Sequence, residues 1–314
     1  MSFAPSSKRS SPSNLAHILL FALALLITFF IFHGDYLFAS TVSADVSLTS
    51  TTTDMTSITT VKPEFRLFIG VITMPELYTR RHLLRTLFSL QTYDKSVAEI
   101  DIRFIFCNLT NEEQRVFVAM EIVLHDDIII LDCKENMNEG KTYKFLSELA
   151  KWYGDEQYDF VMKTDDDSYI ILEELIQSVR DKPRFDMYYG IKIPCDKEDY
   201  FPYQPFMEGM GYVLSWDLIE WVATSDLPRN DHNGPEDMWT GMWFNLAGKA
   251  KNRFDMSPRI YDYKGAAETN CFRHDFIPDS ILVHRLKHDF EWVNTLNYFN
   301  VTSGLKPSKF YSKL

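Results

Sequence analysis

Short apolar segments alternate with segments of helical periodicity after Pro63. Strands are predicted where apolar and β-branched residues cluster, at Phe65–Thr73, Ile100–Cys107, Asp127–Leu131 and Tyr158–Lys163. Helices are predicted between them, near Tyr78–Leu90, from a capping box at Thr110–Glu113 toward Leu124, and over Thr142–Tyr153. This alternation is typical of an α/β sheet with crossover helices.

The second half of the chain is less regular. Its predicted strands are Met187–Ile193, Met210–Leu214 and Ile281–Val283, and its predicted helices are Trp216–Ala223 and Glu236–Leu246. The sequence shows no internal repeat, and it contains neither a Walker nor a GxGxxG phosphate loop. If a nucleotide binds to this chain, we therefore expect its diphosphate to be neutralised by a metal ion instead of by a glycine-rich helix start.

Three consecutive aspartates, Asp165–Asp167, follow the predicted strand Tyr158–Lys163. Adjacent carboxylates at the edge of a core repel one another unless cations or hydrogen-bond donors compensate them. Because extended side chains alternate, Asp165 and Asp167 are expected on one side and Asp166 on the other, which suits one divalent cation. A solvated turn that caps the next helix is the alternative. The position beyond a strand's carboxyl end favours a nucleotide site.

The N-terminal segment predicts a membrane anchor. Lys8 and Arg9 precede an uncharged apolar run, residues 15–32, whose 18 residues lie near the lower limit for spanning a bilayer. The positive flank predicts a cytosolic tail over residues 1–14 and a lumenal remainder. A cleaved signal peptide is the alternative, but the small residues of Val42–Ala44 lie about a dozen positions beyond the apolar run.

Residues 33–63 are predicted to form a stem, and residues 64–314 are predicted to form a single lumenal domain. Between Ser40 and Thr60, 13 of 21 residues are Ser or Thr and none is aromatic, so this part cannot form a core. Sequons at Asn108 and Asn300 agree with a lumenal location, and Asn300 is the better candidate because Asn108 directly follows an apolar strand. The cysteines lack metal-ligand spacing and allow one or two disulfides or free thiols: Cys107, Cys133, Cys195 and Cys271.

Net charge argues against nucleic acid as a partner. The chain carries a formal charge of -12, and binding a phosphate backbone requires a basic face that this composition does not favour. One local basic cluster lies in Thr79–Arg85, where Arg81 and Arg85 share a helix face at i, i+4. These two side chains are candidates to meet a small anionic ligand.

The order of five segments resembles family 31 glycosyltransferases, the β-1,3-galactosyltransferase and Fringe group. The segments are RRHLLRTLF, FVMKTDDDSYI, YFPYQPFMEGMGYVLS, GPEDMWTG and ILVHRL, within residues 65–296. The resemblance implies a GT-A fold, Rossmann-like and α/β, and an inverting transfer from a UDP-sugar with Mn2+. The chain departs from the family pattern at Phe88, at Met238 and in the Glu208–Gly211 turn, so the donor sugar and acceptor stay open.

The resemblance also implies roles for particular residues. Asp165, Asp167 and His284 would bind the metal, and Asp237, with Glu236 as its competitor, would be the general base. The local sequence alone favours other interpretations: His284 as a hydrogen-bonded core histidine, and Glu236–Asp237 as carboxylates in the first turn of a helix. The residues implied to surround the UDP-sugar are Thr73, Arg80, Arg81, Arg85, Lys163, Asp165, Asp166, Gly209 and Gly211.

The chain is expected to be a single-pass type II enzyme of the Golgi membrane. Its expected reaction is the transfer of a hexose, foremost galactose from UDP-galactose, to a glycan or glycoprotein in β-1,3 linkage. Two other hypotheses stay open. A phosphohydrolase would use Asp165 as a nucleophile, although such aspartates normally follow the first strand of their domain. A membrane-tethered carbohydrate-binding pseudo-enzyme would keep the fold without turnover. The sequence does not decide whether the chain forms homo- or hetero-oligomers with other Golgi enzymes.

Overall fold

The computed structural model describes residues 62–154, 158–196 and 204–305. The predicted cytosolic tail, the anchor and nearly all of the stem therefore lie outside the described residues. Within the described ranges, no helix has the length and apolar character needed to cross a bilayer.

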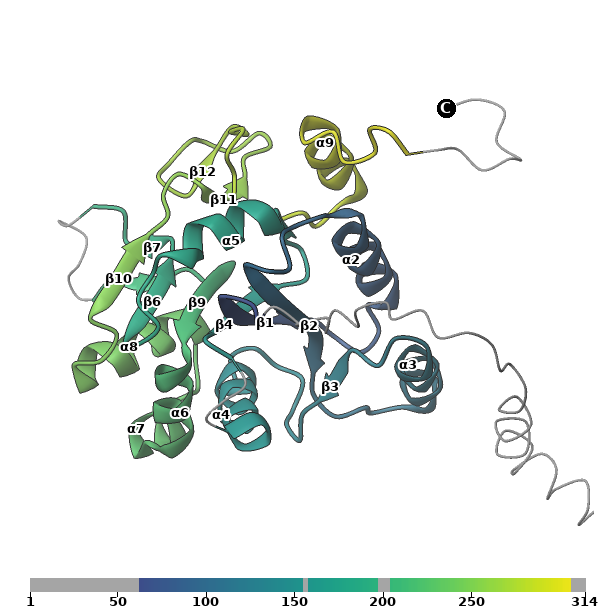
Figure 1. Ribbon diagram of the computed structural model, residues 1–314. Helices are drawn as coiled ribbons and strands as arrows, with labels where there is room; N and C mark the ends of the chain where they lie inside the picture. Colours follow the sequence, from purple (N-terminus) through teal and green to yellow (C-terminus); the bar gives the residue numbers. More distant parts are fainter. Residues whose placement is uncertain (1–61, 155–157, 197–203, 306–314) are drawn as a thin grey trace, which may run out of the picture. The chain divides into compact units, whose positions relative to one another are not determined.

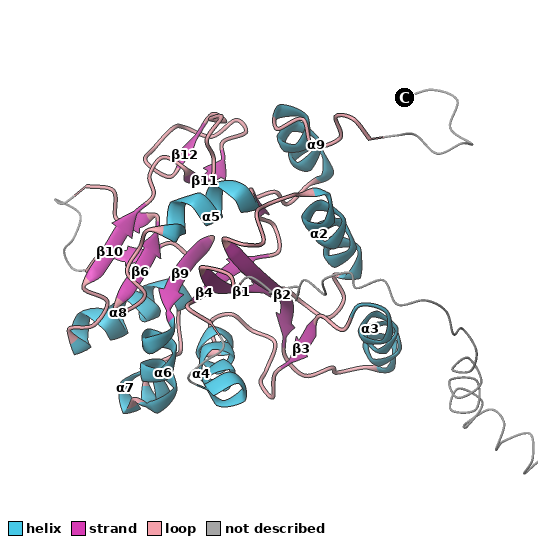
Figure 2. Ribbon diagram, viewed as in Figure 1, coloured by secondary structure: helices cyan, strands magenta, loops and turns pink. Residues whose placement is uncertain are grey.

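A seven-stranded mixed sheet forms the centre of the domain (Figures 1 and 2). Its spatial order is β10 (Asn252–Asp255), β6 (Met187–Gly190), β9 (Gly211–Ser215), β4 (Phe160–Asp165), β1 (Phe65–Ile72), β2 (Ala98–Phe106) and β3 (Ile128–Ile130). Strand β9 is antiparallel to both of its neighbours, whereas β4, β1, β2 and β3 are parallel. The carboxyl ends of β1 and β4 therefore meet at one edge, where Ile72 pairs with Asp165.

Helices cover both faces of this sheet, and strand β1 shows why. Its alternate residues enter two separate cores, with Leu67 and Ile69 in one and Phe68 and Ile72 in the other. Helices α2 (Tyr78–Leu90), α5 (Leu172–Arg180) and α9 (Asp289–Tyr298) contribute to the first core. Helices α4 (Lys141–Tyr153), α6 (Trp216–Thr224) and α8 (Glu236–Ala247) contribute to the second. The remaining described helices are α3 (Glu112–His125) and α7 (Asp226–Asn230).

A smaller sheet brings the end of the domain back to the aspartate motif. Its order is β12 (Arg273–His274), β11 (Ile260–Tyr263), β13 (Leu282–His284) and β5 (Tyr169–Ile170). Because β5 begins two residues after Asp167 and pairs with β13, the last residue of β13 is carried to the aspartates. A two-stranded sheet, β7 (Lys192–Ile193) with β8 (Phe206–Met207), completes the described strands.

These elements confirm the α/β, Rossmann-like class predicted from the sequence, with local corrections. The predicted capping box at Thr110–Glu113 is wrong, because Asn111 and not Thr110 is the N-cap, and its side chain accepts a hydrogen bond from the Gln114 N–H. The predicted strand Met187–Ile193 is interrupted between β6 and β7. All four cysteines are paired, as Cys107–Cys133 and Cys195–Cys271.

Candidate active site

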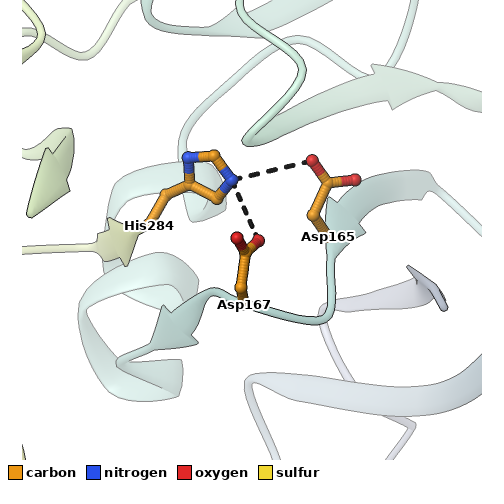
Figure 3. Close-up of side chains that lie close together, drawn as sticks. All are labelled: Asp165, Asp167 and His284. Atoms are coloured by element: carbon orange, nitrogen blue, oxygen red, sulfur yellow. Dashed lines mark ion pairs between the residues drawn. The ribbon is translucent and has the colours of Figure 1, made fainter. Parts of the chain in front are cut away.

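Asp165, Asp167 and His284 form a compact group at the carboxyl end of β4 (Figure 3). One ligand atom from each residue lies within 4.8 Å of the others. The Nε2 atom of His284 is 3.0 Å from Oδ1 of Asp167 and 3.7 Å from Oδ2 of Asp165. The structure thus places Asp165 and Asp167 on the same side, as their alternation predicted, and it adds the histidine that the motif order implied.

This group suits a divalent cation. Two carboxylates and one imidazole are the hard and borderline ligands that Mn2+ accepts. Burial opposes protonation of His284, but its hydrogen bonds with Asp167 and Asp262, together with the negative charge of Asp167, raise its pKa to about 10. The excess of negative charge that holds this proton would equally stabilise a bound metal ion.

The Asp166 side chain lies outside the metal group and contacts Thr73, the residue that follows β1. The Thr73 hydroxyl donates a 2.5 Å hydrogen bond to Oδ2 of Asp166, and burial raises the pKa of this carboxyl. Arg80 donates to the carbonyl oxygens of Asp166 at 3.3 Å and of Leu286 at 3.0 Å. Thr73 and Arg80 therefore lie at the site, where they fix the aspartate loop against the segment that follows His284.

Carboxylates of the chain itself bind Arg81 and Arg85, which argues against the predicted contact of these two side chains with an anionic ligand. Arg81 is fully buried and forms two hydrogen bonds with the Glu121 carboxylate, at 2.6 and 2.9 Å. Arg85 binds the same Glu121 and also both oxygens of Asp127. The two guanidinium groups join α2 to α3 and to Asp127, the residue before β3. Neither arginine is therefore a candidate to bind the ligand.

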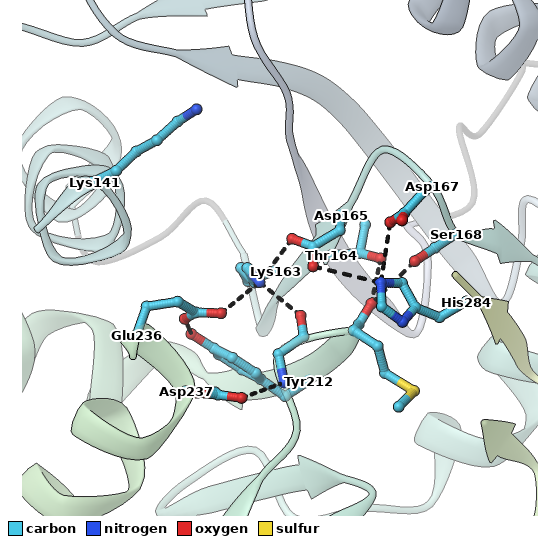
Figure 4. Close-up of polar contacts among 12 residues, drawn as sticks. Lys141, Lys163, Thr164, Asp165, Asp167, Ser168, Tyr212, Glu236, Asp237 and His284 are labelled. Atoms are coloured by element: carbon cyan, nitrogen blue, oxygen red, sulfur yellow. Dashed lines mark hydrogen bonds and ion pairs between the residues drawn. The ribbon is translucent and has the colours of Figure 1, made fainter. Parts of the chain in front are cut away.

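Lys163 connects the metal group to the second acidic pair (Figure 4). Its buried ammonium donates to the Gly209 carbonyl oxygen at 2.6 Å and to Oε1 of Glu236 at 2.6 Å, and it lies 2.8 Å from Oδ1 of Asp165. Three acceptors match the three N–H groups of a lysine. The structure therefore corrects the expectation that Lys163 binds the UDP-sugar, because the residue positions two carboxylates instead.

Glu236 and Asp237 begin helix α8, where the helix dipole favours carboxylates. Glu236 is almost fully buried between Lys163 and the Tyr212 hydroxyl, and burial raises its pKa to about 7. Asp237 accepts backbone hydrogen bonds from Gly209 at 3.1 Å and from Met238 at 2.7 Å. Asp237 has no side-chain cation bound to it among the described residues, which leaves its remaining lone pairs for a proton.

Gly209 has no side chain, which allows its backbone to lie close to the carboxylates of Glu236 and Asp237. A Cβ atom at residue 209 would lie 2.6 Å from Oε1 of Glu236 and 3.3 Å from Oδ2 of Asp237. At Gly211, a Cβ atom would lie 2.6 Å from the Leu282 side chain. Both glycines therefore support the site through packing, and a direct contact with a nucleotide is not needed to explain them.

We expect Gly209→Ala to lower the predicted sugar-transfer activity by about 10²-fold, because the new methyl group displaces Glu236 and Asp237 and small displacements of reacting groups are costly. Its expected stability cost is about 1–3 kcal/mol, typical of overpacking. Gly248→Ala is the control: residue 248 has φ +64° and open space around it, so this change strains the backbone away from the site. Full activity of G209A in a kinetic assay would contradict this role.

A cleft of about 350 Å³ adjoins the metal group, and its lining includes Thr73, Asp165–Asp167 and His284. The sequence analysis did not identify two residues of the cleft wall, Lys141 and Glu135. They form an ion pair, and Lys141 also donates a hydrogen bond to the Thr73 carbonyl oxygen at 2.5 Å. A third residue, Asp262, hydrogen-bonds with His284. No local feature of the sequence distinguishes Lys141 from an ordinary residue at a helix start.

Comparison with curated proteins shows two relatives that cover most of the chain. The chain is 26% identical over 279 residues to beta-1,3-galactosyltransferase pvg3 of Schizosaccharomyces pombe, covering 71% of each protein. It is 25% identical over 247 residues to beta-1,3-galactosyltransferase 6 of Mus musculus, covering 70% of this chain and 73% of the mouse protein. A mouse UDP-GalNAc:beta-1,3-N-acetylgalactosaminyltransferase 2 is 28% identical over 148 residues, 42% of this chain and 29% of its own length.

Two solved structures resemble the chain at a coarser level. Galactosyltransferase LgtC, in complex with donor and acceptor sugar analogs, aligns with a TM-score of 0.44 and 12% identity over 78% of this chain and 98% of LgtC. Mouse xyloside xylosyltransferase 1 aligns with a TM-score of 0.42 and 10% identity over 70% of this chain and 97% of its own. The family model described as Galactosyltransferase matches residues 79–253, more than half of the chain and including the aspartate motif, Lys163 and the Glu236–Asp237 pair. The chain therefore belongs to the galactosyltransferase family, as the order of its motifs predicted.

Proposed function

We propose that this glycosyltransferase is a Mn2+-dependent, inverting enzyme of GT-A type that transfers galactose from UDP-galactose to a glycan or glycoprotein hydroxyl in β-1,3 linkage. The observation that carries the proposal is the pairing of two acidic groups across Lys163. A three-residue set that suits a metal lies on one side, and the Glu236–Asp237 pair lies on the other.

Each group has a separate role in a single displacement. Asp165, Asp167 and His284 would hold Mn2+, which when bound supplies positive charge to the departing diphosphate. Asp237 accepts the proton of the acceptor hydroxyl as that oxygen bonds to the anomeric carbon. The bond from this carbon to the UDP oxygen breaks on the opposite face, which inverts the configuration. Lys163 and Gly209 hold the base at its position.

Galactose is the favoured donor sugar because two relatives are named beta-1,3-galactosyltransferases. N-Acetylgalactosamine is the next candidate, since another relative is named for that sugar. Glu208 distinguishes this chain in the turn before Gly209, and burial together with the charge of Asp237 raises the pKa of its carboxyl to about 7. An acidic group beside the base favours neutral, hydroxyl-rich sugars over anionic ones.

The test is a donor and acceptor screen with the full-length chain, purified in a mild detergent as the predicted anchor requires. UDP release and product formation are measured with UDP-galactose, UDP-N-acetylgalactosamine, UDP-N-acetylglucosamine and UDP-glucose, each with and without Mn2+. The expected result is β-linked product from UDP-galactose only when Mn2+ is present. Absence of product and UDP release with every donor, in folded protein, would overturn the proposal. Phosphohydrolase activity has no separate structural support, because Asp165 is ion-paired with Lys163.

We also propose that the catalytic domain lies in the Golgi lumen, attached through residues 15–32 and oriented as a type II membrane protein. The two disulfides support an oxidising compartment, and both link segments far apart in the sequence. The acceptor glycan or glycoprotein and the UDP-sugar would meet the enzyme there. Self-association, or association with other Golgi enzymes, is not needed to complete the site described above.

Glycosylation provides a direct check of the lumenal location. Asn300 and Asn108 are both exposed, but the Asn108 amide donates to Oδ1 of Asp132 beside the Cys107–Cys133 disulfide, whereas Asn300 lies after α9. We therefore expect Asn300→Gln to remove one N-glycan, seen as a gel shift that disappears after peptide N-glycosidase treatment. Asn108→Gln is the matched control and should leave the mobility unchanged. Unmodified Asn300 in chain expressed in the secretory pathway would contradict the expectation.

A further inference from the structure

Asp262 contacts His284, the histidine of the metal group. The sequence did not point to this carboxylate, and the proposed reaction assigns it no role. Strand β11 lies between β12 and β13, and its register pairs Asp262 with Arg273 on one side and with His284 on the other. Oδ1 of Asp262 is 2.7 Å from Nδ1 of His284, and Oδ2 accepts a 3.1 Å hydrogen bond from Arg273. The three side chains therefore form a row across the small sheet that ends at the metal group.

The contact decides which ring nitrogen of His284 is free to bind a metal ion. A carboxylate only accepts hydrogen bonds, so Nδ1 must carry its proton when it faces Asp262. In the neutral ring, Nε2 then has the lone pair, and this is the atom near Asp165 and Asp167. Figure 3 shows that the other ring nitrogen points away from both aspartates. The alternative tautomer would place an N–H where a metal ligand is needed.

Asp262 is held firmly enough to impose this choice. Its side chain is only 9% exposed, and its second oxygen is occupied by Arg273. Its backbone N–H donates to the Phe272 carbonyl oxygen at 2.7 Å, which fixes the strand as well as the carboxylate. The Arg285 guanidinium lies 3.8 Å from Oδ2 of Asp262, the oxygen that Arg273 occupies. Rotation of Asp262 away from His284 would therefore disturb its contacts with the histidine and with both arginines together.

We propose that Asp262 is a positioning residue that holds His284 in the tautomer whose Nε2 atom binds a divalent cation. The inference rests on the proposed function, because it assigns a purpose to the metal group. Carboxylates that orient a ligating histidine usually change metal affinity by about 10–100-fold when removed. Asp262 therefore acts through His284 and does not touch the sugar or the nucleotide.

The test measures Mn2+ binding by the full-length chain, with MnCl2 alone as the probe and the electron paramagnetic resonance signal of free Mn2+ as the readout. Asp262→Asn keeps the side-chain shape, and its Kd for Mn2+ is expected to rise by about 10–100-fold. Asp275→Asn is the matched control, because Asp275 is an exposed carboxylate near the same sheet that pairs with Lys264. The control is expected to bind Mn2+ like the unmodified chain.

A second readout separates positioning from a general loss of structure. In chain labelled with 15N-histidine and loaded with diamagnetic Zn2+, we expect His284 to show a protonated Nδ1 and a metal-bound Nε2, and Asp262→Asn to lose this pattern. Unchanged Kd and unchanged nitrogen signals in Asp262→Asn would overturn the inference. Failure of the unmodified chain to bind Mn2+ would instead overturn the proposed metal site, so the two failures are distinguishable without a transfer assay.

Discussion

Asp237→Asn should reduce the transfer rate by at least ~10²-fold while UDP-sugar binding persists, the scale of a lost general base. The amide keeps the size of the side chain, but its single carbonyl oxygen can keep only one of the two hydrogen bonds that the Gly209 and Met238 N–H groups donate to Oδ2 and Oδ1 of Asp237, at 3.1 and 2.7 Å. It cannot take a proton from the acceptor hydroxyl. The fall should therefore appear in kcat, with the KM for the donor close to that of the unmodified enzyme.

Asp226→Asn is the matched control for Asp237→Asn, because Asp226 is also a first-turn carboxylate but lies on α7 and is 83% exposed. It should leave kcat unchanged. Glu236→Gln tests the competing assignment. If Glu236→Gln abolishes transfer and Asp237→Asn retains it, the proton passes to Glu236 and the assignment of the base is wrong.

Lys163→Met should destabilise the folded domain by about 3–5 kcal/mol, the cost of removing one partner from a buried ionic network. The change removes the cation that lies 2.8 Å from Asp165 and 2.6 Å from Glu236, and it leaves both carboxylates facing each other in a region of low dielectric. The Gly209 carbonyl oxygen also loses its donor. Chemical denaturation monitored by circular dichroism measures the difference in the free energy of unfolding.

Lys151→Met is the control for Lys163→Met. Lys151 also pairs with a glutamate, Glu148, but it lies on the surface of α4 with 59% of its side chain exposed. Exposed ion pairs contribute about 0–1 kcal/mol, so this change should have a small effect. Equal stability of Lys163→Met and the unmodified chain would show that the carboxylates do not need the lysine, and the role assigned to Lys163 would be lost.

The local sequence pattern was sufficient to predict the order of strands and helices in the α/β class and the arrangement of the aspartate motif, because both depend on residues close together in the sequence. The α/β order followed from alternating strand and helix periodicity, and the shared side of Asp165 and Asp167 followed from the alternation of extended side chains. His284 lies far along the chain, and only the order of motifs connected it to the aspartates. Its place in the group depends on the pairing of β13 with β5, which no local pattern reveals.

The errors come from partners that are distant in sequence. The i, i+4 spacing of Arg81 and Arg85 correctly placed them on one helix face, but it did not show that Glu121 of α3 occupies both. Lys163 in β4 looked available because its acceptor Glu236 lies 73 residues later, at the start of α8. Asp262 was missed since its role arises from strand register. Partner choice between elements is a tertiary property, which a single sequence does not specify locally.

Calorimetric titration of the full-length chain tests whether the aspartate motif binds a metal ion together with uridine diphosphate. UDP is titrated with Mn2+ present, without Mn2+, and with Mn2+ into Asp167→Asn. We predict saturable heat in the first experiment and none in the other two. Absence of heat with Mn2+ and UDP together, in folded unmodified protein, or equal heat in Asp167→Asn, would show that the aspartate motif does not bind this pair.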